Sequence, residues 1–407
     1  MNLEIRPILA TLRRHKTAAS LIVLQVALTC AIVCNALFLI MQRVDRINEP
    51  TGLADDQLVA LAVAGVAPSQ NAEAQTREDL AALRAVPGVQ AVSLLNQIPF
   101  GQNFSMSTLR HSDDEKASGV GAAHYNVREG WLETTGLRLI AGRDFEPSDY
   151  VDGEAFQQSE EAVMPAVILT RRTAERMFPG QQAVGQKVYG LGKGASQVVG
   201  VVEHLVSPQP GSDQEIQRYA MLVPERGTFR GGMFLLRTST AQRDEVRKAA
   251  AAALERSGPG RILLRKQLFT EMREKFYAAD RNMVRLLIGV CVALMVVTAF
   301  GIVGLASFWV QQRTRMIGTR RALGATRGDI QRYFQTENLL LSGTGVLLGM
   351  VAALGISLLL MQRYEMPRLP LFYLPISALV LALLGQLAVL VPARRAAALP
   401  PVAALRS

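Results

Sequence analysis

Cysteine and histidine are scarce in this sequence, and their placement excludes several kinds of site. Its 407 residues include three cysteines, Cys30, Cys34 and Cys291, which all lie in apolar runs. The polar segment between those runs therefore has no disulfide framework. The four histidines, at positions 15, 111, 124 and 204, are not within metal-ligand spacing of one another. Cys30 and Cys34 have the spacing of a metal pair but no supporting histidine, so we predict no metal site and expect small, buried, apolar cysteines.

Motifs for nucleotide binding and catalysis are also missing. No G-x-x-x-x-G-K-[ST] loop is present to hold the phosphates of ATP, and the glycine-rich segment 190–194 has a different spacing that indicates a hairpin turn. No pair of carboxylates and no G-x-S-x-G elbow stands out. Asp144 follows Arg143 and precedes a turn-like Glu-Pro-Ser-Asp segment, which favours a structural ion pair or turn over a catalytic acid. We predict no catalytic residue and no cofactor bound by this chain.

Charge is absent from four long runs, residues 17–42, 286–312, 338–362 and 369–393. Each exceeds the roughly 20 residues needed to cross a bilayer. The first is longer than a signal-peptide core of about 7 to 15 residues and has no cleavage pattern, which predicts a signal-anchor. We therefore predict an α-helical membrane protein with four transmembrane helices. A large α+β domain of two lobes, residues 43–285, is inserted between the first and second spans.

The net charge of +10 is concentrated beside these runs. Residues 43–285 hold 29 Lys and Arg against 30 Asp and Glu, whereas the remainder holds 15 against 4. Basic residues that flank spans are typical of cytoplasmic loops, so nucleic-acid binding is not expected. The distribution predicts a cytoplasmic lead (1–16), loop (313–337) and tail (394–407), with the large domain and the turn 363–368 on the other side of the membrane.

The large domain shows a strand–helix–strand pattern twice. The pattern occurs at Leu58–Ala64, Thr76–Ala85 and Val89–Leu95, and again at Met233–Thr238, Ala241–Arg256 and Arg261–Arg265. This predicts one α/β lobe from residues 50–98 and 230–266, with a strand-rich lobe, about residues 99–229, inserted in it. The polar composition of residues 103–121 and 209–215 predicts that these two segments are mobile loops.

Residues 267–285 carry apolar side chains at helical spacing, and no Pro or Gly interrupts them before Gly289. This predicts a stalk helix that continues unbroken into the second span and can transmit displacement. Ordinary packing of a helix against its own domain is the alternative explanation of the same stripe.

The loop between the second and third spans holds four arginines within residues 318–337, against Asp329 and Glu337. Thr326 with Asp329 three residues later fits a capping box, so a short basic helix is predicted to start there, with Ile330 and Phe334 on one face. Such a helix can press on a cytoplasmic partner. A charged connector that only follows the positive-inside rule is the alternative.

In the third span, Gly345, Gly349, Ala353 and Ser357 recur every four residues. Small residues in a row let helices approach closely in lipid, which predicts a helix-packing face. The sequence leaves open whether the facing helix belongs to this chain or to another. A dimer is favoured because four spans are few for a self-sufficient permeation path.

Five segments, in the family's order and on its layout of spans, resemble the MacB-like, FtsX-family permeases of ABC transporters. RRALGATRGDI at residues 320–330 is similar to the cytoplasmic coupling motif of the family, and PARRAAALPPVAALR at residues 392–406 to its C-terminal signature. WLETTGLRLIAGRDF, AERMFPGQQAVGQKV and VVGVVEHL, at residues 131–145, 174–188 and 198–205, resemble parts of the MacB periplasmic core.

The resemblance implies a subunit of the bacterial inner membrane with a periplasmic large domain, driven by a separate cytoplasmic ABC ATPase that binds the ATP. It implies a homodimer or a pair with a homologous permease, and it allows a periplasmic membrane-fusion protein. Expected substrates are peptides, antibiotics or lipid-linked molecules, exported or extracted from the outer leaflet or periplasm. The coupling residues carried over are Arg320, Arg321, Ala322, Leu323, Gly324, Ala325, Asp329 and Ile330.

Two positions depart from the family pattern. Met316 stands where an acidic residue commonly precedes Ile317-Gly318, and Thr319 stands where an apolar residue is usual. These departures indicate weaker coupling to an ATPase, or pairing with a different permease that carries the missing features. The alternative function is an FtsX-like scaffold that transmits a signal to a periplasmic partner and transports nothing.

Overall fold

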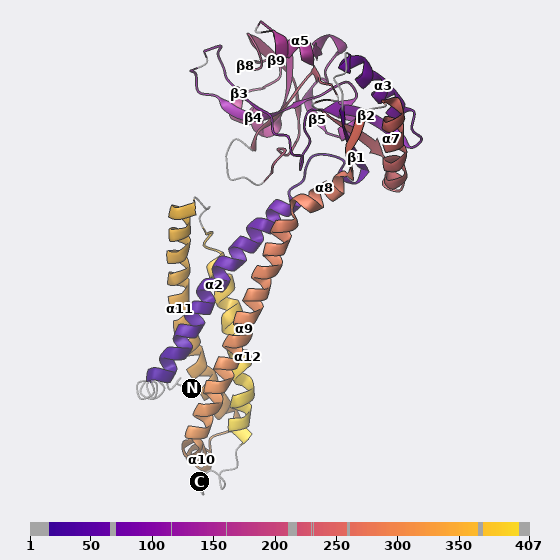
Figure 1. The fold of residues 1–407 in the computed structure, drawn as a ribbon. Coiled ribbons are helices and arrows are strands. Elements are labelled where there is room, and N and C mark those ends of the chain that lie inside the picture. The colour runs from indigo at the N-terminus through magenta and orange to yellow at the C-terminus, as the bar shows by residue number, and fades with distance from the viewer. Residues whose placement is uncertain are drawn as a thin grey trace. The chain divides into compact units, whose positions relative to one another are not determined.

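The computed structural model describes residues 16–65, 71–114, 116–159, 161–210, 218–228, 230, 232–258, 261–364 and 369–398. The predicted basic lead up to residue 15, most of the turn 363–368 and the tail from residue 399 lie outside these residues. The chain divides into two compact units (Figure 1). The helical unit comprises the residues up to Ile47 and from Ala279 onward, and the α+β unit comprises residues 48–278.

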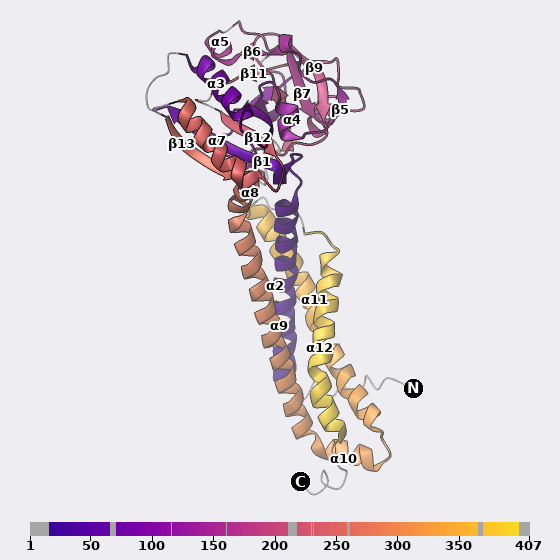
Figure 2. The same cartoon turned by 90° about the vertical axis from the view of Figure 1, so that its right-hand side faces the viewer.

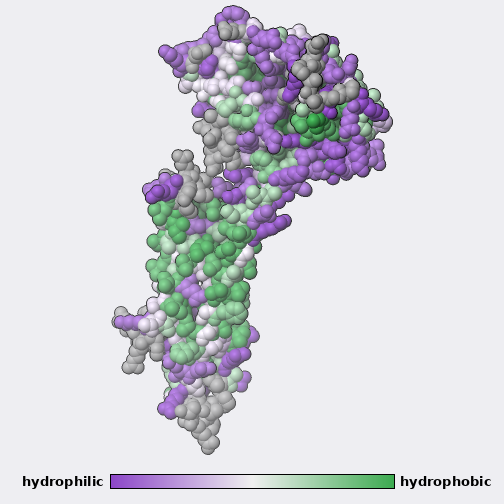
Figure 3. Space-filling view, viewed as in Figure 1, coloured by the Kyte–Doolittle hydropathy of each residue, from purple (hydrophilic) through white to green (hydrophobic). Residues whose placement is uncertain are grey.

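Long apolar helices dominate the described part of the helical unit. They are α2 (Lys16–Asn48), α9 (Ala278–Gln312), α11 (Arg327–Tyr364) and α12 (Tyr373–Ala398), and each is long and apolar enough to cross a membrane. A short helix, α10 (Thr314–Ala322), stands between α9 and α11. Figure 3 shows apolar residues over most of the visible side of this unit, and large side chains such as Phe300 are exposed. Lipid tails are as apolar as these side chains, so a membrane tolerates their exposure.

The predicted unbroken stalk helix is wrong, because the helix is interrupted at Tyr277. Helix α8 (Phe269–Phe276) ends there, with φ −89° and ψ 9° at Tyr277, and α9 begins at the next residue. The Tyr277 ring is buried and stands edge-on to the rings of Phe100 and Phe276, at centroid distances of 5.6 Å and 5.0 Å. Burial of this aromatic ring against a distant loop is a tertiary effect that a helical stripe cannot reveal.

Two other helix boundaries differ from prediction. The basic helix that begins after Thr326 is not short, because it is the first part of α11 and continues to Tyr364. Helix α12, which corresponds to the uncharged run at residues 369–393, begins at Tyr373, passes through Pro392 and ends only at Ala398. A proline inside a helix loses one backbone hydrogen bond, and neighbouring helices in a membrane bundle allow this.

The four-stranded sheet of the α+β unit draws its strands from both ends of that unit. Its order is β13 (Arg261–Leu268), β1 (Leu58–Gly65), β12 (Met233–Thr238) and β2 (Val89–Leu95), and all neighbouring strands are antiparallel. Strands from the N-terminal pair, β1 and β2, therefore alternate in the sheet with strands from the C-terminal pair, β12 and β13. The first and last strands of the unit are neighbours, with Val59 opposite Leu268.

Two helices cover one face of this sheet. Helices α3 (Ala72–Arg84) and α7 (Arg243–Ser257) lie side by side on it (Figure 2). Helix α3 joins β1 to β2, which are parallel and have β12 between them. Helix α7 joins β12 to β13, which are parallel and have β1 between them. These two units are the repeated strand–helix–strand pattern. Their apolar side chains form one core with the sheet, including Leu80, Leu83, Leu236 and Leu254.

The second sheet has the strand order β3-β4-β10-β7-β9-β5, with β8 beside β9. Its strands are β3 (Met106–Leu109), β4 (Val120–Asn126), β5 (Leu139–Gly142), β7 (Ala166–Thr170), β8 (Lys187–Tyr189), β9 (Ala195–Val202) and β10 (Ala220–Val223). Antiparallel pairing of β8 with β9 confirms the hairpin turn at residues 190–194. The mobile loop predicted at 103–121 is wrong in part, because β3 pairs with β4 and buries Leu109. Most of the loop predicted at 209–215 lies outside the described residues.

Short elements complete the α+β unit. They are α4 (Trp131–Thr135), α5 (Gly153–Gln158), α6 (Arg171–Met177) and the 3-10 turns η1 (Asp55–Gln57) and η2 (Pro147–Asp149). Strands β6 (Val151–Asp152) and β11 (Glu225–Arg226) form a small parallel pair of their own.

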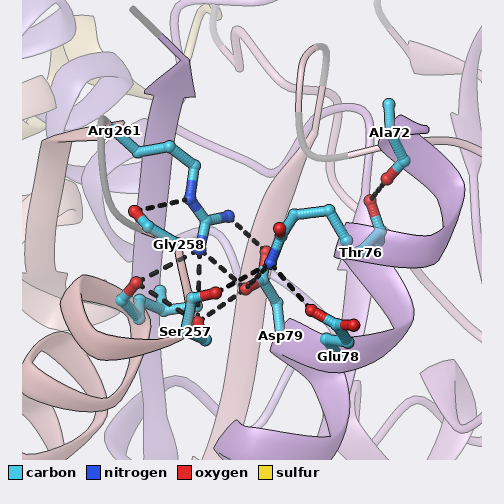
Figure 4. A network of polar contacts seen from close by, with 9 residues as sticks. Ala72, Thr76, Glu78, Asp79, Ser257, Gly258 and Arg261 are labelled. Atoms are coloured by element: carbon cyan, nitrogen blue, oxygen red, sulfur yellow. Dashed lines mark hydrogen bonds and ion pairs between the residues drawn. The ribbon is translucent and has the colours of Figure 1, made fainter. Parts of the chain in front are cut away.

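A buried ion pair joins α3, α7 and β13 (Figure 4). Asp79 on α3 is fully buried, and its Oδ1 accepts hydrogen bonds from Arg261 Nη2 at 2.8 Å and from Ser257 Oγ at 2.7 Å. Arg261 Nη2 also donates to the carbonyl of Leu254 at 3.1 Å. A buried charge is tolerated only when it is paired and hydrogen-bonded, and this pair meets both conditions.

Candidate coupling site

The candidate coupling site is the turn between α10 and α11. Helix α10 ends at Ala322, and the chain reverses through Leu323, Gly324 and Ala325 before α11 begins at Arg327. Gly324 has φ +98°, a left-handed conformation in which glycine avoids the strain of a side chain. The N–H groups of Leu323 and Ala325 bond to carbonyls of α10 at 3.0 Å, so the turn is tied to the helix before it.

The start of α11 is fixed by the predicted capping box. Asp329 Oδ2 accepts hydrogen bonds from the N–H of Thr326 at 3.0 Å and from its hydroxyl at 2.6 Å, and the Asp329 N–H donates back to Thr326 Oγ1 at 3.2 Å. These contacts satisfy backbone donors that a helix start otherwise leaves unpaired. The prediction of a helix start at this point is confirmed.

Both arginines of the predicted motif bind within the helical unit. The Arg320 guanidinium lies 4.8 Å from the centre of the Tyr333 ring on α11, a cation–π contact. Arg321 Nη1 donates to the carbonyl of Ala397, near the end of α12, at 2.8 Å. The two side chains therefore link α10 to both neighbouring helices, a role that the sequence did not reveal.

Apolar side chains under the turn are buried, whereas the turn itself is exposed. Ile317, Ile330 and Phe334 belong to one buried cluster with residues of α2, α9 and α12. Leu323, at the tip, is 83% exposed, and Ala322, Gly324 and Asp329 are also exposed. Ile330 is only 3% exposed. Its side chain packs α11 into the bundle, and contact of Ile330 with an ATPase stays a prediction.

An ion pair that sequence reasoning missed lies at the base of this site. The Arg313 Nη1 atom is 2.7 Å from Glu337 Oε2 and 2.9 Å from Glu337 Oε1, and both side chains are buried. The Arg313 guanidinium also lies 5.5 Å from the centre of the Trp309 ring. Arg313 directly follows the uncharged run 286–312, and Glu337 directly precedes the run 338–362. Opposite charges at the two ends of the loop were the sequence signal from which this ion pair could have been predicted. The ion pair connects the end of α9 to α11 across the loop.

The small-residue face of α11 packs against α2 of the same chain. A Cβ atom at Gly345 would lie 2.8 Å from Val26 Cβ, and one at Gly349 would lie 2.5 Å from Cys30 Cβ. Asn35 Nδ2 on α2 donates to the Ala353 carbonyl at 3.3 Å. The facing helix, which the sequence left open, is α2 along this part of the row. Ser357, the last member, is half-buried.

The segment around Asp144 is structural, as predicted. Arg143 Nη1 lies 2.7 Å from Asp149 Oδ2, which also accepts a hydrogen bond from the N–H of Glu146 at 2.8 Å. Asp144 accepts from the N–H of Phe145 at 2.7 Å, and burial raises its pKa. The arginine thus pairs with Asp149 across a 3-10 turn rather than with the adjacent aspartate.

Two family models match this chain. The model for the MacB-like periplasmic core domain matches residues 20–255, more than half of the chain, and the model for the FtsX-like permease C-terminal region matches residues 288–401. The chain belongs to the MacB-like, FtsX-like permease family. Its FtsX-like part contains α10, the turn and α11, and its MacB-like part contains every strand of the two sheets except β13.

Individual relatives of this permease are distant. It is 28% identical over 340 residues to the macrolide export ATP-binding/permease protein MacB 1/2 of Paracoccus denitrificans, covering 81% of this chain and 47% of that protein. It is 23% identical to the uncharacterized ABC transporter permease YknZ of Bacillus subtilis, covering 84% of this chain and 82% of that one. The chain spans about half the length of the MacB relatives that it matches.

Among solved structures, the extracellular domain of the noncanonic ABC-type transporter YknZ from Gram-positive bacteria is similar to 51% of this permease and matches over its whole length. The sequence identity is 18% and the TM-score is 0.32. The periplasmic region of MacB from Actinobacillus actinomycetemcomitans matches 56% of the chain with 14% identity and a TM-score of 0.32.

Proposed function

We propose that this permease couples ATP hydrolysis by a separate cytoplasmic ABC ATPase to movement of its α+β unit. The observation that carries the proposal is the exposed apolar tip at Leu323, held on a turn whose flanking residues are bound to α11 and α12. An exposed leucine on a turn that is hydrogen-bonded to α10 can serve as an aliphatic anchor in a pocket of a partner. ATP binding is assigned to the partner in this proposal, and the 407 residues themselves contain no P-loop.

The coupling residues divide into two groups by their surroundings. Ala322, Leu323, Gly324, Ala325 and Asp329 form or cap the exposed turn and are proposed to define the surface offered to the ATPase. Arg320, Arg321 and Ile330 are proposed to transmit its displacement, since they contact Tyr333, the Ala397 carbonyl and the buried cluster. A force on the tip then reaches α11 and α12 through short, well-defined contacts.

We further propose the orientation and assembly. The excess of basic residues beside the spans supports a cytoplasmic location for both termini and the loop 313–337, and a periplasmic location for residues 43–285 in a bacterial inner membrane. The proposed domain division keeps the α/β lobe at residues 50–98 and 230–266 and the inserted lobe at about 99–229. A homodimer or a pair with a homologous permease is proposed, with a periplasmic membrane-fusion protein as a further partner.

The substrate class is proposed from the relatives. Because MacB relatives are named as macrolide export proteins, we propose export or extraction of an antibiotic, peptide or lipid-linked molecule from the periplasmic side. Transport of labelled erythromycin by the reconstituted permease and ATPase would support this. Stimulated ATPase activity without transport of any of these three classes would instead favour a signal-transmitting scaffold.

The coupling proposal is tested by capture of the co-expressed ABC ATPase on the affinity-tagged full chain. Leu323→Glu places a charge at the tip and should abolish capture and permease-dependent ATP hydrolysis. Leu264→Glu is the matched control, because Leu264 is also largely exposed but lies on β13 of the α+β unit. Undiminished capture by the Leu323→Glu protein would refute the assigned contact.

A further inference from the structure

A cavity of about 290 Å³ opens between the two sheets of the α+β unit. Leu94 on β2 and Gly232, just before β12, line it from the four-stranded sheet. Asn126 on β4, Glu225 on β11 and Gln157 on α5 line it from the other side. The volume is at the lower end of the range for small-molecule sites, and junctions between substructures are where such sites commonly lie.

The carboxylate of Glu225 is the central polar group of this cavity. Glu225 is only 6% exposed. Its Oε2 accepts a hydrogen bond from Asn126 Nδ2 at 2.6 Å, and its Oε1 accepts one from Gln157 Nε2 at 3.3 Å. Both donors are neutral amides, so neither supplies the positive charge that a buried carboxylate requires.

Two nearby arginines pair with other carboxylates. Arg226 Nε lies 2.6 Å from Glu129 Oε1, and the Arg128 guanidinium binds both oxygens of Glu73 at 2.7 Å and 2.8 Å. Arg230 lines the cavity as an exposed residue. Within the described ranges, no ion pair reaches Glu225. The carboxylate is therefore buried without a cationic partner from this part of the chain.

Other groups around Glu225 add acceptors and negative charge. Asn126 Oδ1 is buried and has no hydrogen-bond donor in the described structure. Glu154 contributes a second carboxylate at the exposed side of the cavity. Burial raises the pKa of Glu225, the hydrogen bond from Gln157 opposes this, and the charge of Asp152 adds to it.

We propose that this cavity binds a small organic ammonium ligand. Its N–H groups would donate to the Glu225 carboxylate and approach Asn126 Oδ1, while its carbon skeleton would lie against Leu94. A charge-assisted hydrogen bond of this kind is roughly twice as strong as a neutral one. A metal ion is the less suitable occupant, because the described residues contain no group of three or more His, Cys, Asp or Glu side chains that could hold one.

The test is calorimetric titration of the full chain in detergent micelles with three ammonium probes: methylammonium, putrescine and glucosamine. At least one of these amines should bind. The neutral counterparts are methanol for methylammonium, butane-1,4-diol for putrescine and glucose for glucosamine. The counterpart of the amine that binds should bind at least about tenfold more weakly, because it lacks the charge. Binding of a neutral counterpart as tight as that of its amine, or no heat with any amine up to about 10 mM, would overturn the proposal.

Matched variants locate the ligand. Glu225→Gln retains the side-chain shape and one carbonyl acceptor but removes the charge, and should weaken ammonium binding about tenfold or more. Glu161→Gln is the control, because Glu161 pairs with Lys193 on the surface, away from the cavity. Thermal unfolding of both variants shows whether they remain folded. Equal affinity in the Glu225→Gln protein, or an equal loss in the Glu161→Gln protein, would refute the assignment.

Discussion

At the scale of single residues, the Asp79–Arg261 pair is the clearest determinant of stability in the α+β unit. Asp79 is fully buried, so Asp79→Leu leaves the Arg261 charge buried without its partner and should cost about 3 to 5 kcal/mol. The expected result is faster hydrogen–deuterium exchange in α3 and β13 of the full chain. Asp244→Leu is the control: Asp244 pairs with Arg247 at 2.7 Å on the surface and should cost less than about 1 kcal/mol.

A double variant separates pairing from packing at the same site. Asp79→Leu combined with Arg261→Met removes both charges and should recover much of the lost protection, because replacing both partners by apolar residues leaves no uncompensated charge. Exchange in the double variant as fast as in Asp79→Leu alone would mean that the geometry of the pair, rather than its charge balance, holds the three elements together.

Asp149 gives the molecule a predictable response to acid. Burial tends to raise the pKa of this carboxyl, but the hydrogen bonds from Arg143 and from the Glu146 N–H outweigh it and lower the pKa. Its stabilisation should therefore be present above about pH 4, the ordinary range of aspartate, and be lost as the pH falls through the lower folded pKa. Both partners are partly exposed, so the effect should be below about 1 kcal/mol.

The measurement for Asp149 is exchange protection of β5 at pH 7 and after a brief pulse at pH 3. Asp149→Asn should lower protection at pH 7 and should lower it by less at pH 3, where part of the stabilisation is already lost. Glu175→Gln, on the exposed face of α6, should change neither value. A constant difference between Asp149→Asn and the parent protein at both pH values would contradict the assignment of the effect to this carboxylate.

At the scale of elements, the contact of α2 with α11 depends on glycine. Gly349→Ala would place a Cβ 2.5 Å from Cys30 Cβ, so the helices must separate. The free energy of unfolding should fall by about 1 to 3 kcal/mol, which is measured as a lower unfolding midpoint in micelles. Gly355→Ala on the same helix meets nothing within 4 Å and should be neutral or stabilising, since alanine favours helix. Equal midpoints for the two variants would contradict the close packing.

The predictability of elements from sequence depended on whether their signals were local. Val89–Leu95 and Met233–Thr238 form strands with the predicted bounds, because turn residues and alternating side chains mark their ends. Strand β3 was missed, since its single buried side chain, Leu109, is surrounded by polar loop residues. The helix break at Tyr277 escaped because contacts with Phe100, far away in sequence, determine it.

The candidate site was predictable only in part for the same reason. The capping box of Thr326 and Asp329 spans three residues and was found from spacing alone. The Arg321–Ala397 and Arg313–Glu337 contacts span 76 and 24 residues, and no local pattern specifies them. Residue types indicated candidate side chains, whereas packing determined which of them face outward.

At the scale of the whole molecule, the proposed orientation predicts a labelling pattern. The three native cysteines are buried and free, so a chain in which they are replaced by alanine provides a background. In intact spheroplasts, a membrane-impermeant thiol reagent should label Lys193→Cys and leave Leu323→Cys unlabelled until the membrane is opened. Both positions are exposed in the structure. Labelling of both in intact spheroplasts would contradict the orientation.

The pairing of β1 with β13 has a consequence for the evolution and engineering of this permease. Since Val59 faces Leu268, the polypeptide enters and leaves the α+β unit at one end of a single antiparallel ladder. A module whose two attachment points adjoin can be exchanged for another with neighbouring termini while the flanking helices stay as they are. Chimaeras that carry a foreign α+β unit between residues 48 and 278 should therefore leave the helical unit intact.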